Sequence, residues 1–199
     1  MAEKRRKVLS AAVSLFLQKG YAATTMDEIA AKAGIAKGTV YLYFRDKADL
    51  YASLLEERIG ALLGELEKIA ALPAAPANRL EAMVRCNLQF IAKRYSGAEF
   101  MADLSVGHDP DMLKTVRTRF TPRFAAILQL FAGVIREGTE QRVFRAVDPF
   151  ATAARIFGLI NVNLMRRAID RRPIAPARET ASLVDLILHG VAAERSSRK

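Results

Sequence analysis

Apolar residues recur every three or four positions along most of the chain, and no stretch of useful length alternates as a β-strand would. The first such stripe predicts a helix from Glu3 to Lys19 that ends at Gly20. A longer stripe predicts a helix from Lys47 to about Leu72, which the prolines of segment 73–76 terminate. Helices with one buried face therefore dominate the sequence.

The rest of the chain continues the helical pattern. Helices are predicted over residues 79–95, 109–138, 148–170 and 177–194. Those beginning at Asp109 and Asp148 start with an Asp-Pro pair, which places an N-cap before a proline at the first helical position. Pro122 is expected to disturb the helix in which it lies. The predicted fold is all-α.

Residues 25–44 contain two short helices joined by a tight turn. Thr25 is a good N-cap, and Glu28 occupies the position at which a capping box has an acidic residue. The first helix stops at Gly34, which accepts the left-handed backbone of a sharp exit, and a second short helix starts near Ala36. This arrangement predicts a helix-turn-helix, whose second helix enters the major groove of DNA.

The second helix carries side chains suited to that role. Val40 and Phe44, four residues apart, hold it to the body of the protein, and Gly38 suits a backbone that comes close to another molecule. We expect Thr39 and Tyr41 to help read bases, while other donors in the group hold phosphates. The predicted DNA-binding residues are Thr25, Lys37, Gly38, Thr39, Tyr41, Tyr43 and Lys47.

This stretch resembles the DNA-binding signature of the TetR family of bacterial transcription regulators, and the resemblance covers roughly residues 4–51. The matching positions are Val8-Leu9, Ala12, Leu15-Phe16, Gly20-Tyr21, Thr25, Ile29-Ala30, Ala33-Gly34-Ile35, Lys37-Gly38-Thr39, Tyr41, Tyr43-Phe44, Lys47 and Leu50. Ala36 departs from the pattern, because the family often has a serine there that touches phosphate. Ala48 replaces a common glutamate, a change expected to matter little.

The resemblance implies an architecture as well as a DNA partner. An N-terminal three-helix module containing the helix-turn-helix is joined by a long helix to a C-terminal helical domain for ligand binding and dimerisation. We place the DNA-binding domain at residues 1–50 and the ligand-binding and dimerisation domain at residues 51–199. A weaker match at residues 138–151 resembles the loop before the penultimate helix of many family members.

The composition predicts an anionic partner. The 199 residues are 51% hydrophobic, enough for a sizeable core, and carry a formal net charge of +10. Nucleic acid and an acidic membrane surface both suit that charge, so charge alone leaves both open. No apolar run reaches the roughly 18 residues of a transmembrane helix, and the basic N-terminus is amphipathic rather than a signal peptide.

The sequence offers little for catalysis or metal binding. Cys86 is the single cysteine, which excludes an internal disulfide and suits a reducing cytoplasm, where we expect the protein to act. No metal-ligand cluster, Gly-rich phosphate loop or nucleophile motif is present, and the two histidines are far apart. We therefore predict no enzyme activity, no cofactor and no metal.

The last two predicted helices are apolar on more than one face, which a helix with one wet side does not need. Two such helices from each subunit can form a four-helix interface, and the family resemblance also implies a homodimer. Burial within a single chain is the alternative. The residues assigned to the interface are Phe157, Ile160, Leu164, Leu183, Ile187 and Gly190.

From the proline-rich break into the predicted helix over residues 148–170, the chain carries apolar and aromatic residues with a few amides. Such a mixture describes a small-molecule pocket, although it also fits a plain core. Asn87 and Asn161 are the informative members, because an amide on an apolar face needs a partner. The candidate lining is Met83, Asn87, Phe90, Phe120, Phe124, Asn161 and Met165.

We interpret the chain as a sequence-specific DNA-binding transcription regulator. The leading hypothesis is a homodimeric repressor that a small, mostly apolar effector releases from a palindromic operator. Within DNA binding, the alternatives are a ligand-requiring activator and a corepressor-dependent regulator. From another class, a basic amphipathic protein of the membrane surface shares the charge but lacks the helix-turn-helix, so no membrane partner is predicted.

Overall fold

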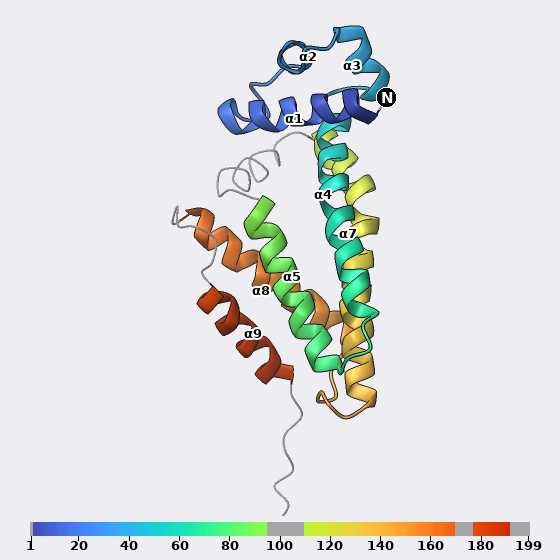
Figure 1. Cartoon of the computed structure of the whole chain (residues 1–199), viewed down its shortest axis with the longest axis vertical. Helices are drawn as coiled ribbons and strands as arrows, with labels where there is room; N and C mark the ends of the chain where they lie inside the picture. The colour runs from blue at the N-terminus through green and yellow to red at the C-terminus, as the bar shows by residue number, and fades with distance from the viewer. Residues whose placement is uncertain (1, 95–109, 170–176, 192–199) are drawn as a thin grey trace, which may run out of the picture. The chain divides into compact units, whose positions relative to one another are not determined.

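The computed structural model describes residues 2–94, 110–169 and 177–191. Within those ranges every regular element is an α-helix and no β-strand occurs, which confirms the all-α prediction (Figure 1). The helices are α1 (Ala2–Lys19), α2 (Met26–Ala33), α3 (Lys37–Tyr43), α4 (Lys47–Ala70), α5 (Pro76–Arg94), α7 (Pro110–Glu140), α8 (Pro149–Ile169) and α9 (Ala177–Val191). None of the described helices is long and apolar enough to cross a membrane.

The helix ends follow the capping residues. Asp46 Oδ1 accepts from the Asp49 N–H at 2.7 Å and caps α4, and Asp148 Oδ1 accepts from the Ala151 N–H at 2.6 Å and caps α8. The expected disturbance at Pro122 does not end α7, which continues through it. Proline removes the bond to the carbonyl four residues earlier, and here Thr118 is exposed, so water can satisfy that carbonyl.

The chain divides into two compact units, one of residues 1–59 and 98–123 and one of residues 60–97 and 124–199. Helices α4 and α7 each contribute residues to both units. The expected domain boundary after residue 50 stays a prediction. The division also shows that the first part of α7, up to residue 123, belongs to the same unit as the helix-turn-helix.

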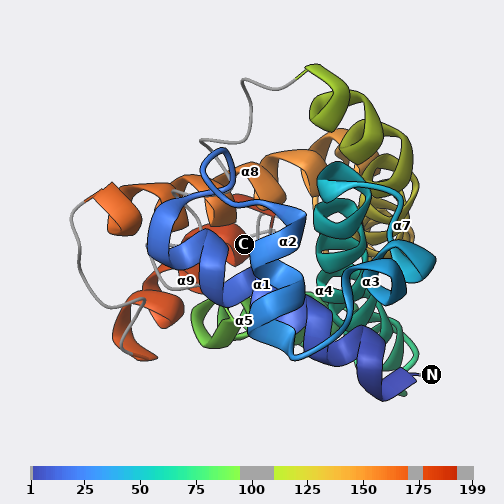
Figure 2. The same cartoon turned by 90° about the horizontal axis from the view of Figure 1, so that it is seen from above.

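The hydrophobic core of the first unit is formed by side chains from α1 to α4. Helices α1, α2 and α3 are drawn in blue shades in Figure 2. Val8 and Ala12 of α1, Ile29 of α2 and Val40 of α3 are each 0% exposed. At the other end of α1, the rings of Phe16, Tyr21 and Tyr51 form a cluster with centroids 5.4–5.7 Å apart. This packing holds the two short helices, which are too short to be stable alone.

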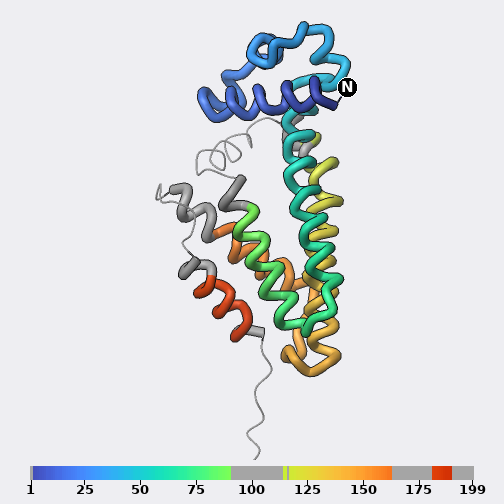
Figure 3. The backbone as a smooth tube through the Cα atoms, in the orientation of Figure 1, coloured from blue at the N-terminus to red at the C-terminus, as the bar shows by residue number. Residues whose placement is uncertain are grey.

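In the second unit α5 packs against α8 and α9 (Figure 3). Its core includes Leu66, Leu80, Met83, Ile127, Phe131, Ile135 and Ile160, each 0% exposed. Arg79, at the start of α5, donates to the Ala70 carbonyl at 2.9 Å and forms an ion pair with Glu137. That one side chain therefore ties together the end of α4, the start of α5 and the end of α7.

Candidate nucleic-acid interface

Helix α2 begins with the predicted capping box. The Glu28 N–H donates to Thr25 Oγ1 at 3.3 Å, and the Thr25 N–H donates to Glu28 Oε2 at 2.9 Å. Lys19 Nζ also binds this carboxylate at 2.5 Å, and with Thr25 it lowers the pKa of Glu28 from 4.5 to about 2. The Thr25 hydroxyl thus serves the helix, and its predicted phosphate contact stays a prediction.

The turn between α2 and α3 has the left-handed geometry that its glycine predicts. Gly34 has φ 65° and ψ 36°, and its N–H donates to the Ala31 carbonyl at 3.1 Å. The N–H of Ile35 donates to the Ala30 carbonyl, also at 3.1 Å, while its side chain packs against the core. These bonds fix the direction in which α3 leaves.

Helix α3 is anchored on one side and open on the other. Val40 is 0% exposed, and Phe44, which follows the helix, is 1% exposed. Tyr43 and Thr39 are half-buried at the edges of this anchor. The exposed residues of α3 are Lys37, Gly38, Tyr41 and Leu42. The anchoring side chains predicted from the sequence are therefore confirmed, and a mixed polar and apolar face is left for a partner.

Two residues at the start of α3 suit close approach to an anion. Lys37 Nζ lies 2.8 Å from Asp27 Oδ1, and this contact raises the pKa of the lysine. Both side chains are about 60% exposed, so the pair can exchange its carboxylate for a phosphate. A Cβ on Gly38 would meet nothing within 4 Å in the described residues, so the protomer itself does not require glycine there.

Lys47 lies where the sequence predicts, at the first turn of α4, but it is already engaged. Its Nζ donates to the carbonyls of Tyr21, Ala22 and Thr24 at 2.8, 3.2 and 2.8 Å, and it lies 4.4 Å from the centroid of the Tyr21 ring. An ammonium has three donors, so this loop uses all of them. The structure adds a loop-holding role that sequence reasoning missed, while the phosphate contact stays a prediction.

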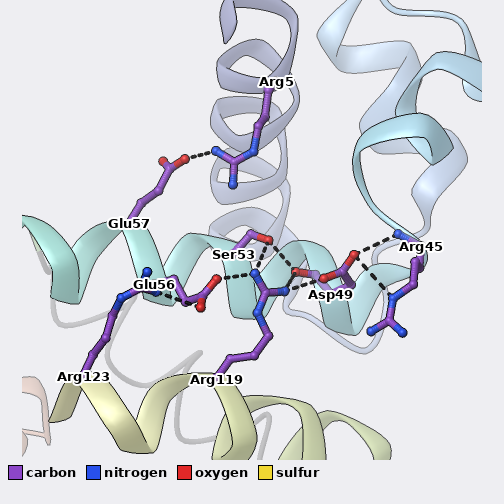
Figure 4. Close-up of polar contacts among 8 residues, drawn as sticks. All are labelled: Arg5, Arg45, Asp49, Ser53, Glu56, Glu57, Arg119 and Arg123. Atoms are coloured by element: carbon purple, nitrogen blue, oxygen red, sulfur yellow. Dashed lines mark hydrogen bonds and ion pairs between the residues drawn. The ribbon is translucent and has the colours of Figure 1, made fainter. Parts of the chain in front are cut away.

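A second missed feature joins α4 to α7 within the first unit (Figure 4). Arg119 of α7 pairs with Asp49 and Glu56 and donates to Ser53 Oγ at 3.1 Å. Asp49 Oδ2 also accepts from the Arg45 N–H at 2.9 Å, directly after the end of α3. The carboxylates lie seven residues apart and so share one face of α4, but nothing in the sequence identifies their partner.

Glu56 and Glu57 extend the same set of contacts in two directions. Arg123 Nη1 of α7 lies 2.7 Å from Glu56 Oε1, and Arg5 of α1 pairs with Glu57 (Figure 4). The Arg5 guanidinium also lies 5.4 Å from the centroid of the Phe44 ring. Side chains of α1 and α7 therefore both contact the first half of α4, which follows the helix-turn-helix in the chain.

The residues predicted to line a pocket fall in both units. Phe120 belongs to the first unit, whereas Met83, Asn87, Phe90, Phe124 and Asn161 belong to the second. The side chain of Met165 lies outside the described residues.

Asn87 is 0% exposed, and neither its amide nitrogen nor its amide oxygen has a hydrogen-bond partner among the described residues. Asn161 instead donates to the Phe157 carbonyl at 2.9 Å, one turn back in its own helix. Of the two amides, Asn87 is therefore the one that has no partner within residues 2–94, 110–169 and 177–191.

The residues assigned to a dimer interface are largely used inside one chain. Ile160 is 0%, Ile187 4%, Phe157 8% and Leu183 8% exposed, and the Phe157 ring packs edge-on against Phe124 with centroids 4.9 Å apart. Leu164 and Gly190 lie outside the described side chains.

The exposed apolar residues of α8 and α9 are neighbours of the assigned ones. Leu159 and Leu186 directly precede Ile160 and Ile187, and Val162 follows one turn of α8 later than Leu159. The predicted helices can still form an interface, but they would present these residues rather than the buried ones.

Comparisons with known proteins agree with this geometry. Residues 8–54 match the sequence model of the bacterial regulatory proteins of the tetR family. The fatty acid metabolism regulator protein of Bacillus subtilis is 24% identical over 195 residues, which cover 96% of this chain and 98% of that protein. The HTH-type transcriptional regulator AcrR of Shigella flexneri is 41% identical over 81 residues, 39% of this chain and 37% of the relative.

The fold is shared with solved structures. The transcriptional regulator FadR from Bacillus subtilis, in complex with stearoyl-CoA, aligns with a TM-score of 0.77 at 20% identity, covering 93% of this chain and 98% of that one. The family match falls on residues of α1 to α4, the same helices that build and hold the helix-turn-helix. Residues 8–54 therefore carry a DNA-binding domain of the tetR family of bacterial regulatory proteins.

Proposed function

We propose that this regulator is a homodimeric, cytoplasmic repressor that a small, mostly apolar effector releases from a palindromic operator. The observation that carries the proposal is α3, which Val40 and Phe44 anchor while its opposite side is exposed. A twofold dimer presents two such helices, and two symmetric half-sites follow from that symmetry.

On DNA we assign the α3 face two kinds of contact. Thr39 and Tyr41 read base edges, and Lys37 leaves its exposed pair with Asp27 for a phosphate. Gly38 lets the backbone come close to the duplex. The remaining phosphate contacts are those of Thr25, Tyr43 and Lys47.

The dimer is assigned to the exposed apolar residues of α8 and α9. Leu159 is 42%, Val162 64% and Leu186 61% exposed. Fully burying an exposed side chain of this size is worth roughly 1.5–3 kcal/mol, so covering each of these partly exposed ones stabilises an association by about half as much. The adjacent Gly158 is exposed, and a Cβ added to it would meet nothing within 4 Å among the described residues. A partner helix can therefore approach this position closely.

The effector is assigned to the second unit, with Asn87 as its polar anchor. A buried amide without partners costs free energy unless a ligand or water satisfies it. Met83, Phe90 and Phe124 supply apolar and aromatic surface in the same unit. Because one similar protein is named for fatty acid metabolism and one similar structure carries stearoyl-CoA, long-chain acyl thioesters are the effector class to test first.

Release from DNA then follows from a two-state equilibrium. Helices α4 and α7 contribute residues to both units, so a ligand that prefers one conformation of the second unit changes the helices that carry the first. The expected result is a changed separation of the two α3 helices and weaker operator binding. The coupling must be reciprocal, so the operator weakens the effector by the same factor.

The first experiment is selection of binding sites from random duplexes with the purified full chain. We expect a palindrome with two half-sites in equivalent major-groove positions. Enrichment of no common sequence would contradict the proposal, and tight binding to anionic vesicles without operator preference would favour the membrane-surface class. The selected site also leads to the regulated promoter.

The second experiment measures reciprocity with acyl thioesters of graded chain length. We expect saturating ligand to raise the operator dissociation constant roughly 5- to 150-fold, and operator to weaken the ligand equally. Asn87→Leu should keep or raise the melting temperature, because it removes an amide that the described part of the chain does not satisfy, yet it should weaken ligand binding. Gln89→Leu, an exposed position on the same helix, is the control. A ligand that binds equally well with and without operator would contradict the switch, and one that tightens operator binding would indicate a corepressor-dependent regulator.

A further inference from the structure

Leu42 of α3 is 84% exposed, more than any other large hydrophobic side chain in the part of the chain that the structure describes. Exposure alone carries little meaning, because single exposed leucines are common on protein surfaces. Its position is what makes it informative. Leu42 lies in α3, the helix that the proposed function places in the major groove. The other residues of α3 already have a role as anchors or as contacts to DNA, and Leu42 does not.

Helical geometry places Leu42 at the centre of the outward side of α3. At 3.6 residues per turn it is rotated by about 200° from Val40, the fully buried anchor, and Gly38 by about 160° in the same sense. Tyr41 is rotated by only about 100° and is correspondingly less exposed, at 43%. If this side of α3 faces the groove, Leu42 and Gly38 point most directly at the base pairs.

Gly38 and Leu42 are four residues apart, so they are neighbours on the helix surface. A Cβ at Gly38 would find nothing within 4 Å among the described residues, so space around it inside the protomer does not explain the glycine. Close approach of the α3 backbone to the base pairs explains it. That approach brings the next outward side chain, Leu42, against the floor of the groove.

Only one group in the major groove matches a leucine side chain. The base edges present hydrogen-bond donors and acceptors, and the single apolar group among them is the C5-methyl of thymine. Against any polar edge, leucine would remove water without replacing its hydrogen bonds. We infer that Leu42 is a specificity-determining residue that reads one thymine in each half-site through its C5-methyl group.

This inference rests on the proposed function, and it can be tested separately by removing only the methyl group. Deoxyuridine keeps every hydrogen-bonding atom of thymine and lacks the methyl. Each symmetric pair of thymines in the selected operator is replaced by deoxyuridine, one pair at a time, and the dissociation constant is measured at fixed salt. Loss of one buried methyl group is worth about fourfold, so loss in both half-sites weakens binding by about 15-fold.

We expect wild-type protein to show this loss at one thymine pair, and Leu42→Ala to lose affinity for the thymine operator but show no further loss with deoxyuridine. Leu17→Ala, an exposed leucine of α1, is the control and should keep the wild-type pattern. Because Leu42 is so exposed, its substitution should leave the circular dichroism spectrum and melting temperature unchanged.

Three outcomes overturn the inference while leaving operator binding intact. They are an operator with no methyl-sensitive thymine, a deoxyuridine penalty that persists in Leu42→Ala, and a Leu42→Ala variant that weakens all duplexes alike. Failure to select any operator contradicts the proposed function itself. The two failures are therefore distinguishable.

Discussion

Replacing Arg119 with methionine would test whether the α7 contact holds the helix-turn-helix unit together. Arg119 is the one described side chain that binds Asp49, Ser53 and Glu56 of α4 at once (Figure 4). Methionine keeps an unbranched apolar stem and removes the guanidinium. The substitution leaves two carboxylates in a partly buried site with fewer partners.

The burial of these groups sets the expected magnitude. The side chain of Arg119 is 29% exposed, that of Glu56 22% and that of Asp49 15%. Exposed ion pairs contribute about 0–1 kcal/mol, and breaking a buried pair costs about 3–5 kcal/mol. Glu56 keeps Arg123, and Asp49 keeps the Arg45 N–H, which reduces the loss. We therefore expect the free energy of unfolding to fall by about 1–3 kcal/mol.

Urea denaturation at one fixed protein concentration gives the comparison, because the stability of the proposed dimer would depend on concentration. Arg117→Met is the matched control, since Arg117 is exposed on the same helix. The Asp49→Asn and double variants complete a cycle, for which we expect a coupling of at least about 0.5 kcal/mol between Arg119 and Asp49. A loss in Arg119→Met no larger than in Arg117→Met, together with zero coupling, would refute this reasoning.

The other predictions concern single positions. Lys47→Ala should weaken all duplexes alike and lower the slope of log K against log salt by about one, measured by fluorescence titration; a changed sequence preference would contradict the phosphate role. Gly138→Ala should destabilise by about 1–3 kcal/mol because the new Cβ would lie 2.3 Å from the Phe144 ring, whereas Gly133→Ala, with nothing within 4 Å, should stabilise by up to about 1 kcal/mol. Equal urea midpoints for these two variants would be inconsistent with that packing. Because the folded-state pKa of Glu28 is lowered from 4.5 to about 2, its cap should stabilise the protein above pH 4.5 and lose that effect as the pH falls toward 2. A carboxyl NMR titration with a midpoint near 4.5 would show that the Lys19 and Thr25 contacts do not form.

Features set by neighbours in sequence are predicted well. Thr25 with Glu28, the left-handed Gly34 and the Asp148 cap each involve groups within a few residues of one another. Their chemistry is local, so the sequence contains both partners at known spacing. The same reason explains why the ends of most helices lie within three residues of their expected positions.

Features set by distant neighbours are not predictable in the same way. Arg119 and Asp49 are 70 positions apart, and no spacing rule connects them. For helix α8, the sequence shows apolar residues on several faces, but it does not show which face the chain covers by itself. The apolar pattern therefore assigns Ile160 to an interface with a partner subunit, although the protomer itself buries this side chain. Leu159 beside it is 42% exposed. Periodicity indicates that a helix is buried and leaves the identity of its neighbour open.

The contacts of the first unit also change how the net charge relates to DNA. Arg5 pairs with Glu57 and Lys37 with Asp27, while Lys47 binds carbonyls. A cation that leaves its carboxylate for a phosphate leaves an anion near the DNA, and that anion repels the duplex. Each such exchange therefore gains less than a contact by an unpaired cation. The 31 lysine and arginine residues accordingly overstate the number of phosphates that this protein can neutralise, and affinity must depend more on how closely α3 fits the groove.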